Sequence, residues 1–183
     1  MKPLIKINLL LFFLFSVNLI MAQKFIKQDS SSIIYVDKVN SLDELLAKFK
    51  GNLVYVDFWA SWCSSCLAEF IPEPQLDDFI KSNNIIRIYI ALERPEKDSL
   101  AQLKSIEKWK NSTQKFNLTG YHYYGLLFSE FMHGITEKIM KGKLSLPRFS
   151  IIDSYGIIVD RDAKRPSNTD GLMKELSKYL NNK

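Results

Sequence analysis

The sequence predicts an α/β fold in which a central mixed β-sheet is covered by helices on both faces. Three observations predict it. Apolar strand patterns alternate with helical ones along most of the chain, which is typical of strands joined through helices. Two of the strand patterns are apolar on both faces, as in strands buried inside a sheet. A hairpin and one last amphipathic helix close the chain, so the sheet also contains antiparallel strands.

The strand patterns are rich in apolar and β-branched residues. They are expected over residues 33–36, 53–59, 85–92, 147–153 and 157–159. Those over 53–59 and 85–92 are the two that are apolar on both faces. The last two are joined by the turn Asp153-Ser154-Tyr155-Gly156 and form the hairpin. The stretch 116–124 is too irregular to assign.

The helical patterns repeat apolar residues every three or four positions. They are expected after the capping box Ser41-Leu42-Asp43-Glu44, from near Cys63, from Pro95, and over 172–180. Gly51 ends the first of these helices. Pro72 and Pro74 are expected to kink or break the second, because proline removes a helical hydrogen bond. Two short helices are also expected, over 126–131 and 135–141.

The chain begins with a targeting signal. Lys2 and Lys6 form a basic segment, a continuous apolar run over 9–15 follows it, and Ala22 is a small residue suited to cleavage. An uncleaved membrane anchor over 4–22 is the alternative, since this segment is almost long enough to span a bilayer. Either way we expect an exported domain, which in a bacterial cell means the periplasm or cell envelope, where disulfides persist.

One domain is expected beyond residues 1–22. The polar stretch 23–32 is expected to be a flexible lead-in, and the domain fills 33–183. The formal net charge of +5 comes from scattered lysines rather than from a basic block. Nucleic-acid binding needs a concentrated basic face, so the charge pattern argues against it.

Cys63 and Cys66 carry the clearest chemistry and are the only two cysteines in the 183-residue sequence. They lie where a strand pattern passes into a helical one. A thiol in the first turn of a helix meets unpaired backbone N–H groups, which favour the reactive thiolate. The second thiol lies one helical turn further on, near enough to form a disulfide with the first. The spacing therefore favours a redox-active pair, which needs no metal or organic cofactor.

Three other interpretations of the cysteines stay open. A structural zinc site needs four ligands, and only His122 and His133, far along the chain, could complete one. A structural disulfide closing so short a loop would restrain little chain entropy. The third interpretation is a pair of inert buried thiols.

The run from Val56 to Cys66, Val-Asp-Phe-Trp-Ala-Ser-Trp-Cys-Ser-Ser-Cys, resembles the active-site segment of thioredoxins. The wider layout is similar to the exported, TlpA-like branch of the thioredoxin superfamily. The resemblance covers 33–180 and includes Pro147 at the start of the hairpin. It implies a thioredoxin-like fold with a helical insertion before the strand that follows a cis-proline. It also implies a protein-disulfide oxidoreductase.

The resemblance implies roles for three catalytic residues. Cys63 would be the exposed nucleophile and Cys66 the buried resolving thiol. Asp57 would exchange a proton with Cys66. The sequence independently supports this role, because an acid inside an apolar strand has a raised pKa and becomes a usable proton acceptor. The alternative for Asp57 is an acid at the strand end that reaches solvent or caps the next helix.

The remaining site residues concern substrate binding and tuning. The resemblance implies that the Leu146–Pro147 bond is cis and that Leu146 presents its backbone to an extended substrate chain. Trp62 is expected on the exposed lip of the site. Ser64 and Ser65 stand where thioredoxins have Gly-Pro, and residues at these positions tune the reduction potential of the pair.

Together these expectations describe an exported enzyme that reduces disulfides in envelope proteins through a mixed disulfide. Its partners would be thiol or disulfide proteins of the envelope, such as those of cytochrome maturation, and a membrane electron donor. The residues 4–22 could tether it to the membrane.

Four alternatives to this function remain. A thiol oxidant that installs disulfides would use the same residues. A thioredoxin-fold binding or chaperone module would use the fold without turnover. A peroxidase of the peroxiredoxin group is disfavoured, because the proline of its active-site motif is absent before Cys63. Copper handling by the two thiols and a histidine is the fourth.

Overall fold

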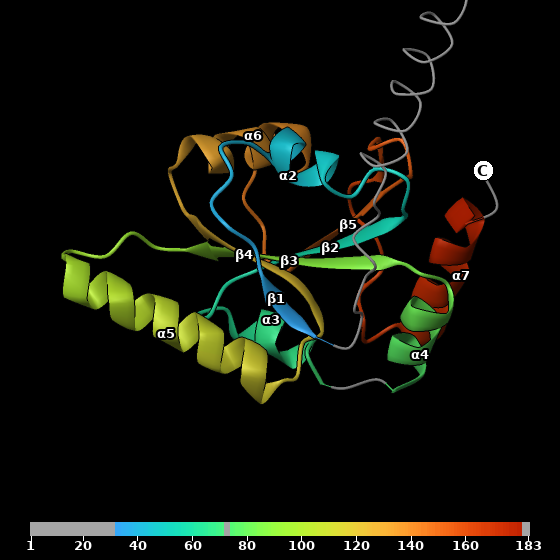
Figure 1. The fold of residues 1–183 in the computed structure, drawn as a ribbon, viewed down its shortest axis with the longest axis horizontal. Coiled ribbons are helices and arrows are strands. Elements are labelled where there is room, and N and C mark those ends of the chain that lie inside the picture. Colours follow the sequence, from blue (N-terminus) through green and yellow to red (C-terminus); the bar gives the residue numbers. More distant parts are fainter. Residues whose placement is uncertain (1–31, 72–73, 181–183) are drawn as a thin grey trace, which may run out of the picture.

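A computed structural model of the chain describes residues 32–71 and 74–180. The predicted targeting segment over 1–22 and all but the last residue of the lead-in over 23–32 lie outside the described residues. Within the described part, the chain forms a six-stranded sheet with helices on both faces (Figure 1). This confirms the predicted α/β class. No helix of the described ranges is both long enough and apolar enough to cross a membrane.

The strand order across the sheet is β1-β4-β3-β2-β5-β6. The bounds are β1 (Ile33–Tyr35), β2 (Val54–Trp59), β3 (Ile86–Glu93), β4 (Gly120–Leu126), β5 (Arg148–Ile152) and β6 (Ile158–Asp160). The first four strands pair in parallel, whereas β5 and β6 pair antiparallel, so the sheet is mixed as predicted. Parallel pairing aligns the carboxyl ends of β2, β3 and β4 at one edge of the sheet.

The helices divide between the two faces of the sheet (Figure 1). Their bounds are α2 (Leu42–Ala47), α3 (Ser64–Ala68), α4 (Pro74–Ser82), α5 (Ser99–Lys115), α6 (Glu130–Lys138) and α7 (Thr169–Leu180). Helices α2 and α6 cover one face, and α3, α4, α5 and α7 cover the other. The sheet is therefore buried on both sides, which explains its strongly apolar central strands.

Strand β2 shows how the sequence fills both faces. Val56 and Phe58 pack into the apolar cluster under α2 and α6. Tyr55 and Trp59 pack on the opposite face. Because successive strand residues alternate between faces, Asp57 belongs with Tyr55 and Trp59, and it is only 2% exposed.

The helix cap at Ser41 and the helix break at the prolines, both expected from the sequence, are present in the structure. The Ser41 hydroxyl accepts a hydrogen bond from the Glu44 N–H at 3.1 Å and starts α2. The helix after Cys63 is broken, since α3 ends at Ala68 and α4 begins at Pro74. Helix α5 begins at Ser99, a few residues later than expected, because the Asp98 carboxylate caps it.

The region between α5 and β5 differs from the expectation. The unassigned stretch 116–124 contains most of β4, which continues to Leu126, so the short helix expected over 126–131 is wrong. Instead of the helix expected over 135–141, one helix, α6, runs from Glu130 to Lys138, and the Ser129 side chain caps it. Strand β4 pairs with β1 and β3. That pairing comes from residues distant in sequence, which local patterns do not show.

Candidate active site

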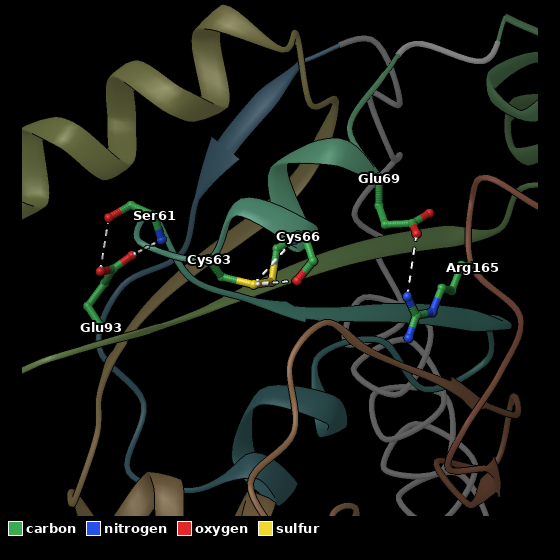
Figure 2. The surroundings of a disulfide bond; sticks show 7 residues. Ser61, Cys63, Cys66, Glu69, Glu93 and Arg165 are labelled. Carbon is green, nitrogen blue, oxygen red and sulfur yellow. Dashed lines mark hydrogen bonds and ion pairs between the residues drawn. A yellow bond between two sulfur atoms is a disulfide. The ribbon is translucent and has the colours of Figure 1, made fainter.

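Cys63 and Cys66 form a disulfide at the amino end of α3 (Figure 2). Cys63 is the residue that caps the helix, and its Sγ accepts a hydrogen bond from the Cys66 N–H at 3.2 Å. This is the contact expected from the sequence. When the pair is reduced, a backbone N–H directed at the Cys63 sulfur stabilises the thiolate.

The two sulfurs differ in exposure. Cys63 is 7% exposed and Cys66 is 1% exposed. The order agrees with the roles implied by the resemblance, in which the first thiol attacks and the second resolves. However, even Cys63 presents only a small part of its surface, so a substrate disulfide must fit closely against the neighbouring residues.

The two serines between the cysteines lie on the surface. The Ser65 hydroxyl lies 3.4 Å from Cys63 Sγ, and either group could donate. In the reduced pair this hydroxyl can donate to the Cys63 thiolate. Ser65 is therefore placed to tune the pair, whereas Ser64 acts at most through its backbone in α3.

The Leu146–Pro147 bond is cis, as predicted. Pro147 is buried, and Leu146 packs against the cluster that contains both cysteines. The pairing of Arg148 with Phe58 places this segment beside the carboxyl end of β2. The structure thus brings Leu146 and Pro147 next to the redox pair, although they are about eighty residues away in sequence.

The two tryptophans near the cysteines differ in exposure to solvent. Trp62 is 39% exposed, and the Arg94 guanidinium carbon lies 4.6 Å from the centroid of its ring. Trp59 is fully buried. This is the expected division, with Trp62 on the lip of the site and Trp59 in the core.

Asp57 is the buried acid of the site. Burial raises its pKa well above the usual value, Arg87 opposes this shift, and Glu69 adds to it. No atom of residues 32–71 or 74–180 hydrogen-bonds to Asp57 Oδ1. The burial of Asp57 argues against the alternative of a solvent-facing or helix-capping side chain, and the raised pKa favours the neutral, protonated form of the carboxyl group.

A cavity of about 80 Å³ connects Asp57 to the surface. Its lining includes Asp57, Glu69, Asp77, Arg87 and Tyr89. The Arg87 guanidinium donates to Asp77 Oδ1 at 2.8 Å and to the Tyr89 hydroxyl at 3.0 Å. A cavity of this size with several polar groups in its wall can hold water beside Asp57.

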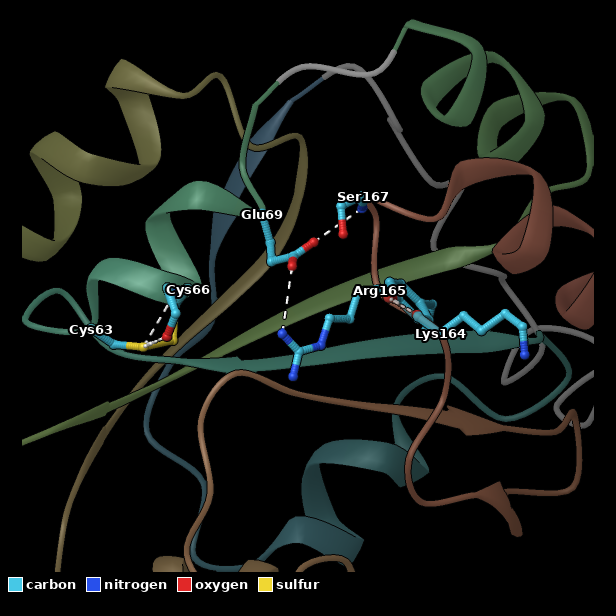
Figure 3. A network of polar contacts seen from close by, with 8 residues as sticks. Cys63, Cys66, Glu69, Lys164, Arg165 and Ser167 are labelled. Carbon is cyan, nitrogen blue, oxygen red and sulfur yellow. Dashed lines mark hydrogen bonds and ion pairs between the residues drawn. A yellow bond between two sulfur atoms is a disulfide. The ribbon is translucent and has the colours of Figure 1, made fainter.

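Glu69 is a site residue that the sequence analysis missed. It lies one helical turn after Cys66, at the end of α3, and borders the cavity. Its carboxylate accepts the Ser167 N–H at 3.0 Å and pairs with Arg165 at 3.7 Å (Figure 3). The loop that carries Lys164 and Arg165 is therefore attached to α3 rather than free. Its position one helical turn after Cys66 was the sequence feature that could have indicated a place near the redox pair.

Glu93 is the second residue that was missed. It is the last residue of β3, is 2% exposed, and accepts two hydrogen bonds from Ser61 (Figure 2). Burial raises its pKa. The signal was again an acid at the end of an otherwise apolar strand, the pattern that drew attention to Asp57.

The histidines do not approach the cysteines as metal ligands. His122 is fully buried, with Nε2 2.7 Å from the Leu118 carbonyl oxygen. His133 lies exposed on α6, 3.7 Å from Glu137. In the part of the chain described here, no three His, Cys, Asp or Glu side chains gather as a metal site would require.

Comparison with known proteins gives a consistent family and fold. A family model described as redoxin matches residues 36–180. A solved thiol-disulfide oxidoreductase from Bacteroides fragilis NCTC 9343 is 25% identical, with 70% of this chain and 83% of that chain covered and a TM-score of 0.50. The thioredoxin domain of a thiol-disulfide oxidoreductase from Bacteroides vulgatus is 24% identical, with 74% and 84% covered and a TM-score of 0.51. None of the curated proteins compared with the chain matches it.

Proposed function

The chain belongs to the redoxin family and is a thiol–disulfide oxidoreductase of thioredoxin-like fold, and we propose that it works in the cell envelope as a reductant of protein disulfides. The Cys63–Cys66 pair supplies the two electrons. Disulfide-containing envelope proteins are the substrates, and a membrane donor returns the electrons.

The observation that carries the direction is the charge around the pair. Glu69 and Glu93 lie on opposite sides of the disulfide (Figure 2), and Asp57 is buried on the preceding strand. Strong oxidants of this chemistry are oxidising because their reduced form, with its thiolate, is stabilised. Here the contacts of Cys63 Sγ within the described residues are one backbone N–H and one hydroxyl, and the nearby cation Arg165 is paired with Glu69 rather than with the sulfur. Negative charge opposes the thiolate, which favours a reducing pair.

The catalytic cycle starts with the reduced pair. The Cys63 thiolate attacks one sulfur of the substrate disulfide, forming a mixed disulfide and releasing the other substrate sulfur as a thiolate, which takes up a proton. Asp57 accepts the proton of Cys66. The Cys66 thiolate then attacks Cys63 Sγ. This releases the second substrate thiolate and forms the Cys63–Cys66 disulfide, so two electrons have passed to the substrate.

Substrate binding uses the two features beside Cys63. The Leu146–Pro147 segment offers its backbone to an extended chain in the manner of an added strand. Trp62 offers an aromatic surface at the lip of the site. The signal segment over 1–22 delivers the enzyme to the envelope, or tethers it there if uncleaved.

The test of this proposal is the equilibrium reduction potential of the pair in a dithiothreitol or glutathione series, with Cys63→Ser as the control. We expect a value near or below that of thioredoxin, about −270 mV. A value near that of the strong oxidant DsbA, about −120 mV, would reverse the direction. If the two cysteines cannot be reduced and reoxidised at any accessible potential, the chain is not an oxidoreductase, and the alternative of a binding module is favoured. Export is tested by fractionating cells that make the full chain, and a cytoplasmic location would contradict it.

A further inference from the structure

Glu93 is a buried acid that the reaction above does not use. Its side chain is 2% exposed, and it ends a strand whose other residues are mostly apolar. Burying a carboxyl group costs free energy unless hydrogen bonds compensate for the lost water. The compensating hydrogen bonds to the Glu93 carboxylate come from one residue, Ser61, which lies in the turn that carries Cys63.

Both carboxylate oxygens of Glu93 are occupied by Ser61. The Ser61 N–H donates to Oε1 at 2.6 Å, and the Ser61 hydroxyl donates to Oε2 at 3.0 Å (Figure 2). Ser61 lies in the turn between β2 and α3, two residues before Cys63. That turn is also closed by a bond from the Cys63 N–H to the Ala60 carbonyl oxygen at 3.0 Å. The turn that carries the nucleophile is thus attached to β3 through one carboxylate.

The backbone of Glu93 is fixed in turn by the next strand. Glu93 pairs with Leu126 of β4, and the Leu127 N–H donates to the Glu93 carbonyl oxygen at 2.7 Å. The following residue, Arg94, lies over the ring of Trp62. Two successive residues of one strand end, Glu93 and Arg94, therefore contact two successive residues of the active-site turn, Ser61 and Trp62.

We propose that Glu93 is a positioning residue of the redox centre: by binding both hydrogen-bond donors of Ser61, it fixes the turn that presents Cys63 to a substrate disulfide. This inference rests on the proposed redox function of Cys63. It does not depend on the direction of that function, because the same sulfur reacts in either direction.

The negative charge of Glu93 has a second, separable effect. A carboxylate near the nucleophile opposes formation of the Cys63 thiolate. The charged groups that face Glu93 are Lys108 on α5, which lowers its pKa, and Glu96 after β3, which raises it. A neutral amide of the same shape keeps one acceptor oxygen for the Ser61 N–H, its NH2 group can donate to the Ser61 hydroxyl in place of the second bond, and the charge is removed. The two effects can therefore be measured apart.

The experiment compares Glu93→Ala, Glu93→Gln and Ser61→Ala. For each, the rate at which the reduced protein attacks a 2-pyridyl disulfide is measured from pH 5 to 9, which gives the pKa of Cys63 and the limiting rate of its thiolate. We expect Glu93→Ala to lower the limiting rate about tenfold or more, because small displacements of a reacting group slow it strongly. Glu93→Gln should recover most of this rate while the pKa of Cys63 falls. Ser61→Ala, which removes one of the two bonds, should slow the reaction less than Glu93→Ala.

Glu96→Gln is the matched control, since it removes an exposed carboxylate three residues away and should leave the rate within twofold of the wild type. A limiting rate within twofold of the wild type in both Glu93→Ala and Ser61→Ala overturns the proposal. So does a Glu93→Gln variant as slow as Glu93→Ala. If Glu93→Ala does not fold, the limiting rate of Ser61→Ala alone tests the proposal, and a rate within twofold of the wild type overturns it. A wild-type protein that does not attack the probe disulfide would instead contradict the proposed function.

Discussion

The rings of Tyr89 and His122 lie face to face, with centroids 4.7 Å apart and planes 5° from parallel. The two residues are direct partners across β3 and β4. Because a carbonyl oxygen accepts, Nε2 of His122 donates to Leu118 and carries the ring proton. Burial lowers the pKa of His122 to about 4. His122 is therefore a neutral packing residue at neutral pH and not a general base.

The lowered pKa of His122 predicts a loss of stability in acid. The unfolded chain, with the ordinary histidine pKa near 6.5, binds a proton before the folded protein does. The contribution of His122 is thus complete above about pH 6.5 and is lost as the pH falls towards 4. We expect a loss on the order of 3 kcal/mol from this residue. Urea unfolding between pH 4 and 7 should show a flatter pH dependence for His122→Gln than for the wild type; equal slopes would contradict the assignment.

Asp57 predicts the opposite dependence. Its raised pKa means that the folded protein holds a proton that the unfolded chain has already lost, so stability falls as the pH rises above the ordinary aspartate value. Asp57→Asn has no such cost. We expect the oxidised variant to be more stable than the wild type at pH 8. The difference should vanish near pH 4, and a less stable variant at pH 8 would show that the buried carboxylate is compensated.

The same substitution tests the proton-transfer role. Asp57→Asn leaves Cys63 able to attack but removes the acceptor for the Cys66 proton. We expect the resolving step at pH 7 to slow about a hundredfold, the usual range for loss of a general base. The lifetime of the mixed disulfide in rapid-quench experiments measures it. An unchanged lifetime would mean that Cys66 loses its proton directly to water.

The cysteines predict a difference between two single variants. Cys66→Ser retains the attacking thiol and cannot resolve, so it should accumulate a mixed disulfide with its substrates. Cys63→Ser should form none, because Cys66 is only 1% exposed. Mass spectrometry of disulfide-linked complexes from envelope extracts measures this. If Cys63→Ser instead formed stable mixed disulfides with substrates, Cys66 would be the attacking sulfur and Cys63 the resolving one.

The residues with local signals could be predicted from the sequence. Cys63 and Cys66 follow from their spacing at a helix start, and Asp57 follows from an acid within an apolar strand. Pro147 required the family resemblance, because nothing in its local sequence places it near the redox pair. Glu93 carried the same signal as Asp57, but its partner Ser61 is thirty-two residues away. Strand β4 was missed for the same reason, since its pairing with β1 and β3 is set by the fold and not by its own residues.

Arg87 gives a last prediction, which concerns the pH dependence of the resolving step. Of the charges that act on Asp57, Arg87 lowers its pKa and Glu69 raises it. Arg87→Gln should therefore raise the pKa of Asp57, leave less of the carboxylate ionised at neutral pH, and slow the resolving step about tenfold for each pKa unit. Asp77→Asn breaks the same Arg87–Asp77 ion pair but leaves the charge of Arg87 in place, so it is the matched control. We expect the pH midpoint of the resolving step to move upward in Arg87→Gln and to stay in place in Asp77→Asn. Equal shifts in both variants would mean that the ion pair acts by holding α4 against the sheet and not through the charge of Arg87.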